Sequence, residues 1–296
     1  MSSRYIFKDP IFHSGNEKLK GLFLERTHKS SLGIFRILSG TCKVLDEFSN
    51  KNYVLRTNYF QLPFLNNRTI KQQIISDLFP EEVKIFDVAN YFSEFHRNRD
   101  FYDPIEIEVI NCVLARLNNR YLESFLFLYR ILEGVSYSIP LIYTSRSKDF
   151  KKTFRSLQKY VGKSGADSEI KFFRTFINEV FNLEPFYSTS IDIKFDVLEF
   201  EELRSKYFKI YKDKIDDKYI ENEIEDEELN VSFIGFFDFL IELRNRYFHF
   251  LQGTWQNNLA TSDIIYPDQF FKPIIDLGIN WIAVIWFEVL KFDFQN

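Results

Sequence analysis

Residues 231–251 read VSFIGFFDFLIELRNRYFHFL. As a helix, this stretch is apolar on nearly every side, and a helix of that kind has to be buried in a protein core. Its few polar side chains are therefore informative, because burying a polar group is unfavourable unless a partner compensates for the lost water. The stretch predicts a buried helix in a mainly α-helical protein.

Four polar residues follow one line along this helix. They are spaced four, three and four residues apart, which places them within roughly 60° of arc at about 100° per residue; they are Asp238, Glu242, Asn245 and His249. Arg246 flanks this polar stripe. Arg244 projects off the stripe and rejoins it only through its long side chain or across an interface.

The polar stripe has two interpretations. It is either an internal network that ties the helix to its neighbour, or a chemical site. A buried carboxylate, amide and imidazole cost several kcal/mol unless each finds a partner. The two arginines favour a site, because a titratable imidazole beside fixed cations suits chemistry on a phosphate.

A second set of charges follows the segment Asp103-Pro104-Ile105-Glu106. Asp can cap a helix, Pro fits the first position and Glu106 can complete a capping box, so one helix of about nine turns is predicted from here to Pro140. One face of this helix would carry Arg116, Arg120, Glu123 and Arg130, with Glu133 at its edge. This face is either solvated or self-paired, or it packs against the polar stripe, where Glu123 or Glu133 holds an arginine or orients the imidazole.

The remaining elements are predicted from periodicity and breakers. Short apolar runs between Leu32 and Phe64 favour strands and turns, and Thr69–Leu78 and Val83–Phe95 favour short helices. Further on, residues 191–198 alternate as a strand does, and helical patterns cover 148–160, 167–181, 201–212 and 269–292. We therefore expect a smaller α+β N-terminal region, residues 1–103, and a helical domain, residues 104–296, with an insertion at about 185–230.

Composition and charge exclude several classes of protein. The formal net charge of −4 excludes a generally basic protein that coats nucleic acid. Acidity is concentrated in residues 213–228, which hold nine acidic residues and two lysines; this segment is a solvated loop or exposed helix edge, or else an autoinhibitory polyanion.

Two cysteines and four histidines show no zinc spacing, so neither a metal nor another cofactor is predicted. No secretory signal is recognised, and Asp276, Asn280 and Glu288 interrupt the most membrane-like stretch, residues 273–290. We expect that stretch to be a buried helix of a cytoplasmic protein that has no membrane partner.

The segment Arg244-Asn245-Arg246-Tyr247-Phe248-His249 resembles the signature of the HEPN superfamily of prokaryotic defence and toxin ribonucleases. That signature is an Arg, often followed by Asn, then four to six residues and a His. The segment Leu128-Tyr129-Arg130-Ile131-Leu132-Glu133 is similar to helices of abortive-infection HEPN proteins. The resemblance covers roughly residues 104–292.

This resemblance implies a helical bundle that dimerises with its motif helices facing each other, and cleavage of RNA without a metal or other cofactor. The catalytic residues would be Arg244, His249 and Asn245. The residues that would support them are Arg246, Glu242, Asp238, Glu123, Arg130 and Glu133, and those that would bind RNA are Arg116 and Arg120. Arg246 lies closer than Arg244 to the face of His249 on an ideal helix, so either arginine could contact the phosphate.

Three functions compete at this point. The first is a toxin or phage-defence effector that cleaves tRNA or mRNA as a homodimer, with residues 1–103 sensing a phage-derived trigger, binding a partner or restraining the nuclease. The second is a catalytically silent HEPN-like module that dimerises and binds nucleotide or RNA. The third is an unrelated helical interaction protein in which the polar stripe is structural.

Overall fold

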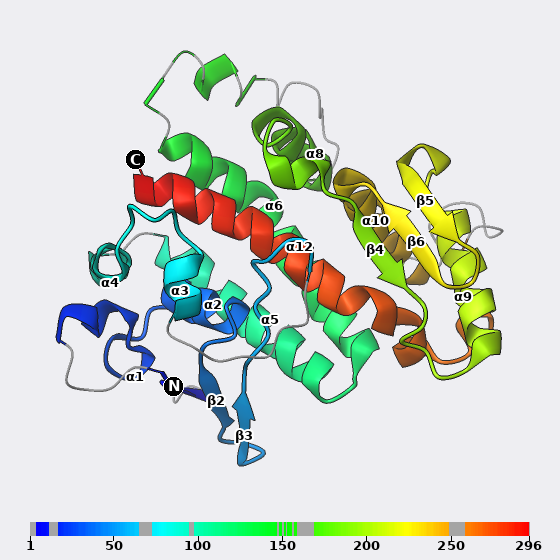
Figure 1. Ribbon diagram of the computed structural model, residues 1–296, viewed down its shortest axis with the longest axis horizontal. Coiled ribbons are helices and arrows are strands. Elements are labelled where there is room, and N and C mark those ends of the chain that lie inside the picture. The colour runs from blue at the N-terminus through cyan, green and yellow to red at the C-terminus, as the bar shows by residue number, and fades with distance from the viewer. Residues whose placement is uncertain are drawn as a thin grey trace. The chain divides into compact units, whose positions relative to one another are not determined.

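The computed structural model describes residues 4–11, 17–64, 73–94, 98–146, 148–149, 151, 153–155, 157–158, 169–248 and 258–295. These residues form a mainly helical protein with two small antiparallel sheets (Figure 1), which confirms the predicted mainly α class. Packing divides the chain into two compact units, residues 1–114 with 283–296 and residues 115–282. The functional boundary at residue 103 stays a prediction, since packed units need not coincide with functional regions.

The first unit combines a three-stranded sheet with short helices. The sheet has the order β1-β2-β3, and its antiparallel register pairs Phe7 with Val44 and Val44 with Tyr53. Its elements are β1 (Tyr5–Lys8), η1 (Glu17–Leu22), α1 (Leu24–Thr27), α2 (Ser30–Leu38), β2 (Lys43–Asp46), β3 (Lys51–Val54), α3 (Gln73–Asp77), α4 (Ile85–Glu94), most of α5 (Arg99–Leu117) and the end of α12 (Pro267–Gln295).

Aromatic rings form the core of the first unit. The ring centroid of Phe35 in α2 lies within 5.6 Å of the ring centroids of Phe60 and Phe92. It lies within 6.5 Å of those of Trp286 and Phe287 in α12. The last turns of α12 therefore belong to the first unit, because their side chains complete its hydrophobic cluster.

The expectation of a strand at residues 33–38 was wrong, because they belong to helix α2. All the residues from Ser31 to Leu38 are buried, so the run has no exposed side, and periodicity cannot separate a buried helix from a buried strand. Arg36 of α2 is completely buried; its guanidinium donates to Thr41 and to the carbonyl of Leu22 and lies 2.8 Å from a carboxylate oxygen of Asp9. The other expectations for this region are confirmed in part. Two strands, β2 and β3, lie between residues 32 and 64, and α3 and α4 lie within the two expected short helices.

The single helix expected from Asp103 to Pro140 was wrong. The chain forms two helices, α5 (Arg99–Leu117) and α6 (Tyr121–Ser145), with a break at Asn119, whose φ is +58°. Asn tolerates this left-handed conformation, and the bonds Arg120 N–H to Ala115 C=O and Asn119 N–H to Arg116 C=O form a Schellman motif.

The expected start and end of that helix also differ. Pro104 lies inside α5 rather than at its first position, and Pro140 lies inside α6. Glu106 does not cap the helix; it is buried and its carboxylate contacts Nε2 of His28 at 2.7 Å. A proline after the first turns of a helix removes one hydrogen bond but need not end it when packing holds the next turns in place.

The second unit combines long helices with a second three-stranded sheet. Its elements are α6, α8 (Glu169–Val180), η2 (Pro185–Ser188), β4 (Ile191–Lys194), α9 (Glu201–Lys214), η3 (Asp217–Tyr219), β5 (Ile220–Ile224), β6 (Glu228–Val231), α10 (Phe233–Phe248), α11 (Thr261–Ile264) and the start of α12. β4, β6 and β5 lie side by side (Figure 1). The strand at 191–198 and the helices at 167–181, 201–212, 231–251 and 269–292 were thus correctly predicted within a few residues, and the helix expected at 148–160 falls largely outside the described residues.

The acidic segment was correctly expected to be solvated, but its predicted form was wrong. Residues 213–228 include β5 and the turn to β6, and every residue from Glu221 to Glu225 is exposed. Leu229 and Val231 of β6 are fully buried and hold this hairpin on the unit, while Asp226 takes a φ of +61° in its turn.

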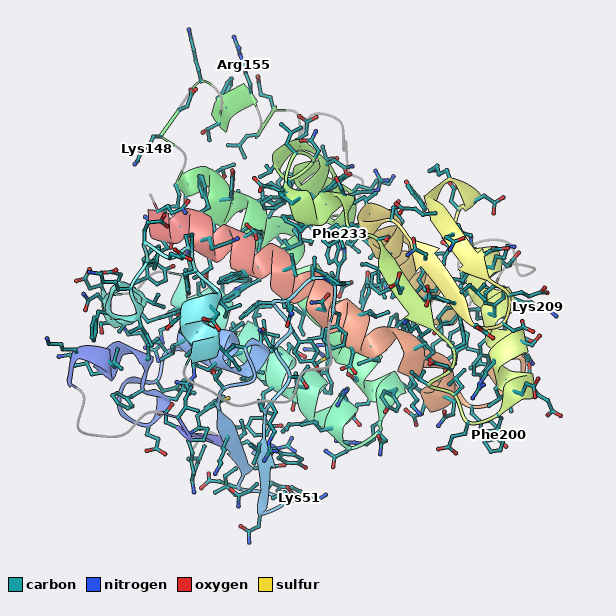
Figure 2. All side chains as sticks on the ribbon, viewed as in Figure 1. Lys51, Lys148, Arg155, Phe200, Lys209 and Phe233 are labelled. Atoms are coloured by element: carbon teal, nitrogen blue, oxygen red, sulfur yellow. The ribbon has the colours of Figure 1, made fainter. Side chains whose placement is uncertain are left out.

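Trp281 organises the core of the second unit. Its ring stacks on Phe233 and Phe237 of α10, and its Nε1 donates to the carbonyl of Phe233 at 2.9 Å. In Figure 2, Phe233 lies in the interior of this unit, whereas Lys209 of α9 points outward. The predicted burial of the long C-terminal helix is confirmed, since 83% of its most apolar 18-residue stretch is buried.

Two helices among the described residues, α6 and α12, are long and apolar enough to cross a membrane. Core helices of globular proteins have the same length and composition, so this is weak evidence for a membrane protein.

Candidate functional site

Helix α10 presents a buried side and a half-buried side. Phe236, Phe239, Leu240 and Leu243 are buried in the core, and this fixes the rotation of the helix. Ile241, Arg244 and Asn245 are consequently only half-buried. These three residues form one wall of a pocket.

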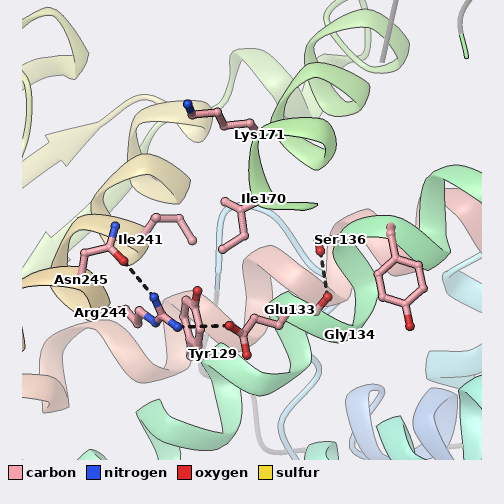
Figure 3. Close-up of a pocket in the computed structure, with 10 residues that line it drawn as sticks. Tyr129, Glu133, Gly134, Ser136, Ile170, Lys171, Ile241, Arg244 and Asn245 are labelled. Carbon is pink, nitrogen blue, oxygen red and sulfur yellow. Dashed lines mark hydrogen bonds and ion pairs between the residues drawn. The ribbon is translucent and has the colours of Figure 1, made fainter. Parts of the chain in front are cut away.

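The pocket has a volume of about 680 Å³ and lies between three helices of the second unit (Figure 3). This volume is in the range of small-molecule sites, which are usually several hundred Å³. Its lining residues are Tyr129, Glu133, Gly134, Ser136 and Tyr137 of α6, Ile170 and Lys171 of α8, and Ile241, Arg244 and Asn245 of α10.

Arg244 is oriented by three neighbours in this pocket. Its guanidinium lies over the ring of Tyr129, 4.3 Å from the centroid, and donates to Glu133 Oε1 at 3.2 Å and to Asn245 Oδ1 at 3.1 Å. Figure 3 shows Glu133 and Asn245 on opposite sides of the guanidinium. These contacts therefore hold the charged guanidinium of Arg244 at the pocket in one orientation.

The charges of the pocket favour an anion. Arg244 and Lys171 are cationic and Glu133 is anionic, which leaves one net positive charge among the lining residues. A guanidinium offers several N–H donors in a plane, which matches the oxygens of a phosphate or carboxylate, and the amide of Asn245 adds another polar contact. The arrangement suits recognition of a phosphate group.

Of the expected site residues, Glu133, Arg244 and Asn245 meet at this pocket. Asp238 does not: it accepts hydrogen bonds from Arg174 of α8, the shortest at 2.7 Å, and this contact raises the pKa of Arg174. The interpretation as an internal network therefore holds for Asp238. Glu242 pairs with Arg246 at 2.6 Å, and neither lines the pocket.

The four charges expected on one face of a long helix are separated by the break at Asn119. Arg116 of α5 forms an ion pair with Asp276, with its Nε 2.7 Å from the carboxylate. Arg120 precedes α6 and pairs with Glu123 at 2.7 Å. Arg130 is exposed on α6, and none of these residues lines the pocket.

His249 lies outside the described residues, since α10 is described to Phe248. Its position relative to Arg244 is therefore known from the sequence spacing alone.

Tyr129 and Lys171 line the pocket but were not among the site residues expected from the sequence. Tyr129 stands four residues before Glu133, so both lie on the same side of α6, and this spacing is the signal that points to Tyr129. Lys171 lies in the first turn of α8, and we find no signal in the sequence that places it here.

The described residues contain no group of three His, Cys, Asp or Glu side chains arranged to hold a metal ion. Comparisons with protein-family models, with curated proteins and with solved structures give no match to this chain. The candidate site is therefore defined by its own geometry and by the resemblance of its motif.

Proposed function

We propose that this protein is a metal-independent endoribonuclease of the HEPN type, which acts as a toxin or abortive-infection effector against phage in the cytoplasm. One observation carries the proposal: Arg244 and Asn245 of the Arg-x4-His motif share a pocket in which the guanidinium is held in place by Glu133 and Tyr129. The HEPN-like bundle, the RNA substrate and the homodimer are parts of this proposal.

In the proposed reaction, the 2′-hydroxyl of a ribose attacks the adjacent phosphorus and the 5′-oxygen of the next nucleotide leaves. His249 takes the proton from the 2′-hydroxyl or gives one to the leaving oxygen, which an imidazole does efficiently near neutral pH. Arg244 stabilises the charge that develops on the phosphate, and Asn245 positions it. The products carry a 2′,3′-cyclic phosphate and a 5′-hydroxyl, and DNA is spared because it lacks the nucleophile.

Of the two arginines in the motif, we propose that Arg244 contacts the phosphate. Arg244 lines the pocket beside Asn245, whereas the guanidinium of Arg246 is engaged by Glu242 on the same helix. Lys171 supports the assignment, because it adds a second cation to the pocket.

The pocket also suits the second candidate, a silent module that binds nucleotide or RNA without cleaving it. The ion pair of Arg244 with Glu133 favours this alternative, since it occupies one edge of the guanidinium. Cleavage assays separate the two candidates.

The test is incubation of the purified protein with tRNA and total RNA in EDTA. We expect cleavage with cyclic-phosphate ends by the wild type, and losses of roughly 10²-fold or more in Arg244→Ala and His249→Ala. Lys209→Ala removes an equal charge from the exposed side of α9 and serves as the matched control. Intact RNA with a folded wild type, or equal cleavage by all variants, would refute the assignment.

A further inference from the structure

The exposed side of α6 carries a regular line of residues. They are spaced four, three, four and four apart and fall within roughly 80° of arc; they are Leu126, Arg130, Glu133, Tyr137 and Leu141, all exposed. We call this line the α6 stripe. Leu126, Tyr137 and Leu141 expose 44%, 50% and 51% of their surface. Single exposed apolar residues are normal, but three aligned on one helix indicate an interaction surface.

The order of residue types along the α6 stripe is symmetric. The two leucines stand at its ends, at equal distances from the point between Glu133 and Gly134. Arg130 and Tyr137 stand inside them, again equidistant from that point. Such an order is what a surface needs in order to pair with a copy of itself about a two-fold axis.

We propose that a second copy of this chain docks on the α6 stripe, with the two α6 helices antiparallel about a two-fold axis between Glu133 and Gly134. In this register, Leu126 packs on the partner's Leu141, so apolar surface meets apolar surface. Arg130 lies on the partner's Tyr137, which pairs a guanidinium with an aromatic face.

Charge favours this register over the parallel one. In a parallel pair, Arg130 would face the partner's Arg130, and facing like charges are unfavourable. The antiparallel register instead separates the two Arg130 by seven residues, about 10 Å along the helix axis, and sets each against an uncharged ring. The two Glu133 lie near the two-fold axis, where Gly134 has no side chain and so leaves room for close approach of the helices.

This interface would complete the candidate pocket. Glu133 and Tyr137 belong both to the α6 stripe and to the pocket lining, so the second copy lies at the edge of the pocket. The partner's Arg130 adds a cation beside Tyr137 in each copy. The inference deepens the proposed function by naming the surface through which two copies share the site, but it rests on the residue order of α6 and would hold equally for a silent module.

Register-specific cross-linking tests the interface on the full chain. Leu126→Cys and Leu141→Cys variants are mixed and treated with a short thiol-to-thiol cross-linker. We expect covalent dimers in the mixture and few with either variant alone, because the same residue on two antiparallel helices in this register is about 22 Å apart at 1.5 Å per residue. The native Cys42 and Cys112 are buried, which keeps the background low. Equal cross-linking of a single variant, or none in the mixture, would overturn the proposal.

A pair of matched variants tests the same surface by sedimentation. We expect a wild-type dimer, a dissociation constant raised at least tenfold by Leu141→Asp, and no change with Phe200→Asp, which alters a 61% exposed phenylalanine at the start of α9 that is not part of the α6 stripe. Circular dichroism checks that each variant folds. A wild type that stays monomeric at every concentration would overturn the interface. Dimerisation in this register with intact RNA would refute only the nuclease, and RNA cleavage by a monomer would refute the interface and the homodimer but not the nuclease.

Discussion

At the scale of single residues, the guanidinium of Arg244 combines a fixed orientation with a replaceable partner. The ring of Tyr129 and the amide of Asn245 hold its plane, while Glu133 is about half exposed. An ion pair with such an exposed carboxylate contributes about 1 kcal/mol or less. An anion that enters the pocket can therefore replace Glu133 at little cost and find the guanidinium already positioned.

The His28–Glu106 pair in the first unit predicts a dependence of stability on pH. Burial opposes the charge of His28, but the hydrogen bond and charge of Glu106, with Asp103 nearby, outweigh it and raise the pKa of His28 above its usual value. For Glu106, burial has the opposite effect and raises the pKa, although His28 offsets part of the rise. Both groups thus bind protons more tightly in the folded chain than in the unfolded one.

The stabilisation from His28 is therefore complete below its unfolded pKa of about 6.5 and is lost as pH rises through its higher folded value. We expect the free energy of unfolding of the first unit to fall as pH rises above about 6.5. Urea unfolding across this window measures it, with His28→Gln as the comparison. A wild type whose pH slope equals that of His28→Gln would contradict this role.

At the scale of elements, the break between α5 and α6 determines which charges reach the pocket. If the two helices were continuous, Arg116 and Arg120 would align with Glu123 on one face. The left-handed residue at Asn119 instead directs Arg116 to Asp276 and leaves α6 free to present Tyr129 and Glu133 to α10.

Substitutions at Asn119 test this break. Asn119→Ala and Asn119→Gly both remove the hydrogen bond that Asn119 accepts from the Tyr121 hydroxyl at 3.1 Å, so their difference isolates the backbone conformation. We expect Asn119→Ala to be less stable than Asn119→Gly by about 1 kcal/mol, because only glycine adopts a positive φ without strain. Chemical denaturation measures the difference, and equal stabilities would argue against the left-handed break.

These elements also show which parts of the structure could be predicted from the sequence. The polar residues of α10, spaced four and three apart, and the alternation of β4 predicted both elements correctly, because each spacing matches one period. The break at Asn119 was not predictable from periodicity, since it depends on one backbone angle. The sequence spacing placed Asp238 and Asn245 on one face of the helix. In the structure, however, Asp238 accepts hydrogen bonds from Arg174, which is 64 residues away in the sequence. Local sequence patterns give no signal for such a partner.

At the scale of the whole molecule, neither the net charge nor the chain order reveals the site. The formal charge of −4 hides a hairpin region, residues 213–228, that carries −7, so the remaining residues sum to +3. Likewise, the end of α12 packs with the N-terminal unit, because its aromatic residues complete that core. For the proposed function, we therefore expect the small cationic pocket to contact one or a few phosphates, without broad coating of nucleic acid by the acidic protein.

The most direct test of a phosphate contact at Arg244 is the salt dependence of RNA binding. The ligand is a single-stranded RNA whose 2′-hydroxyls are methylated, so that it binds without being cleaved. Affinity is measured over a range of salt concentrations for the wild type, Arg244→Ala and the control Lys209→Ala. We predict that Arg244→Ala binds more weakly and that its slope of log affinity against log salt is shallower by about 0.7, the value for one lost phosphate contact. An affinity and slope equal to those of the wild type and Lys209→Ala would contradict the account.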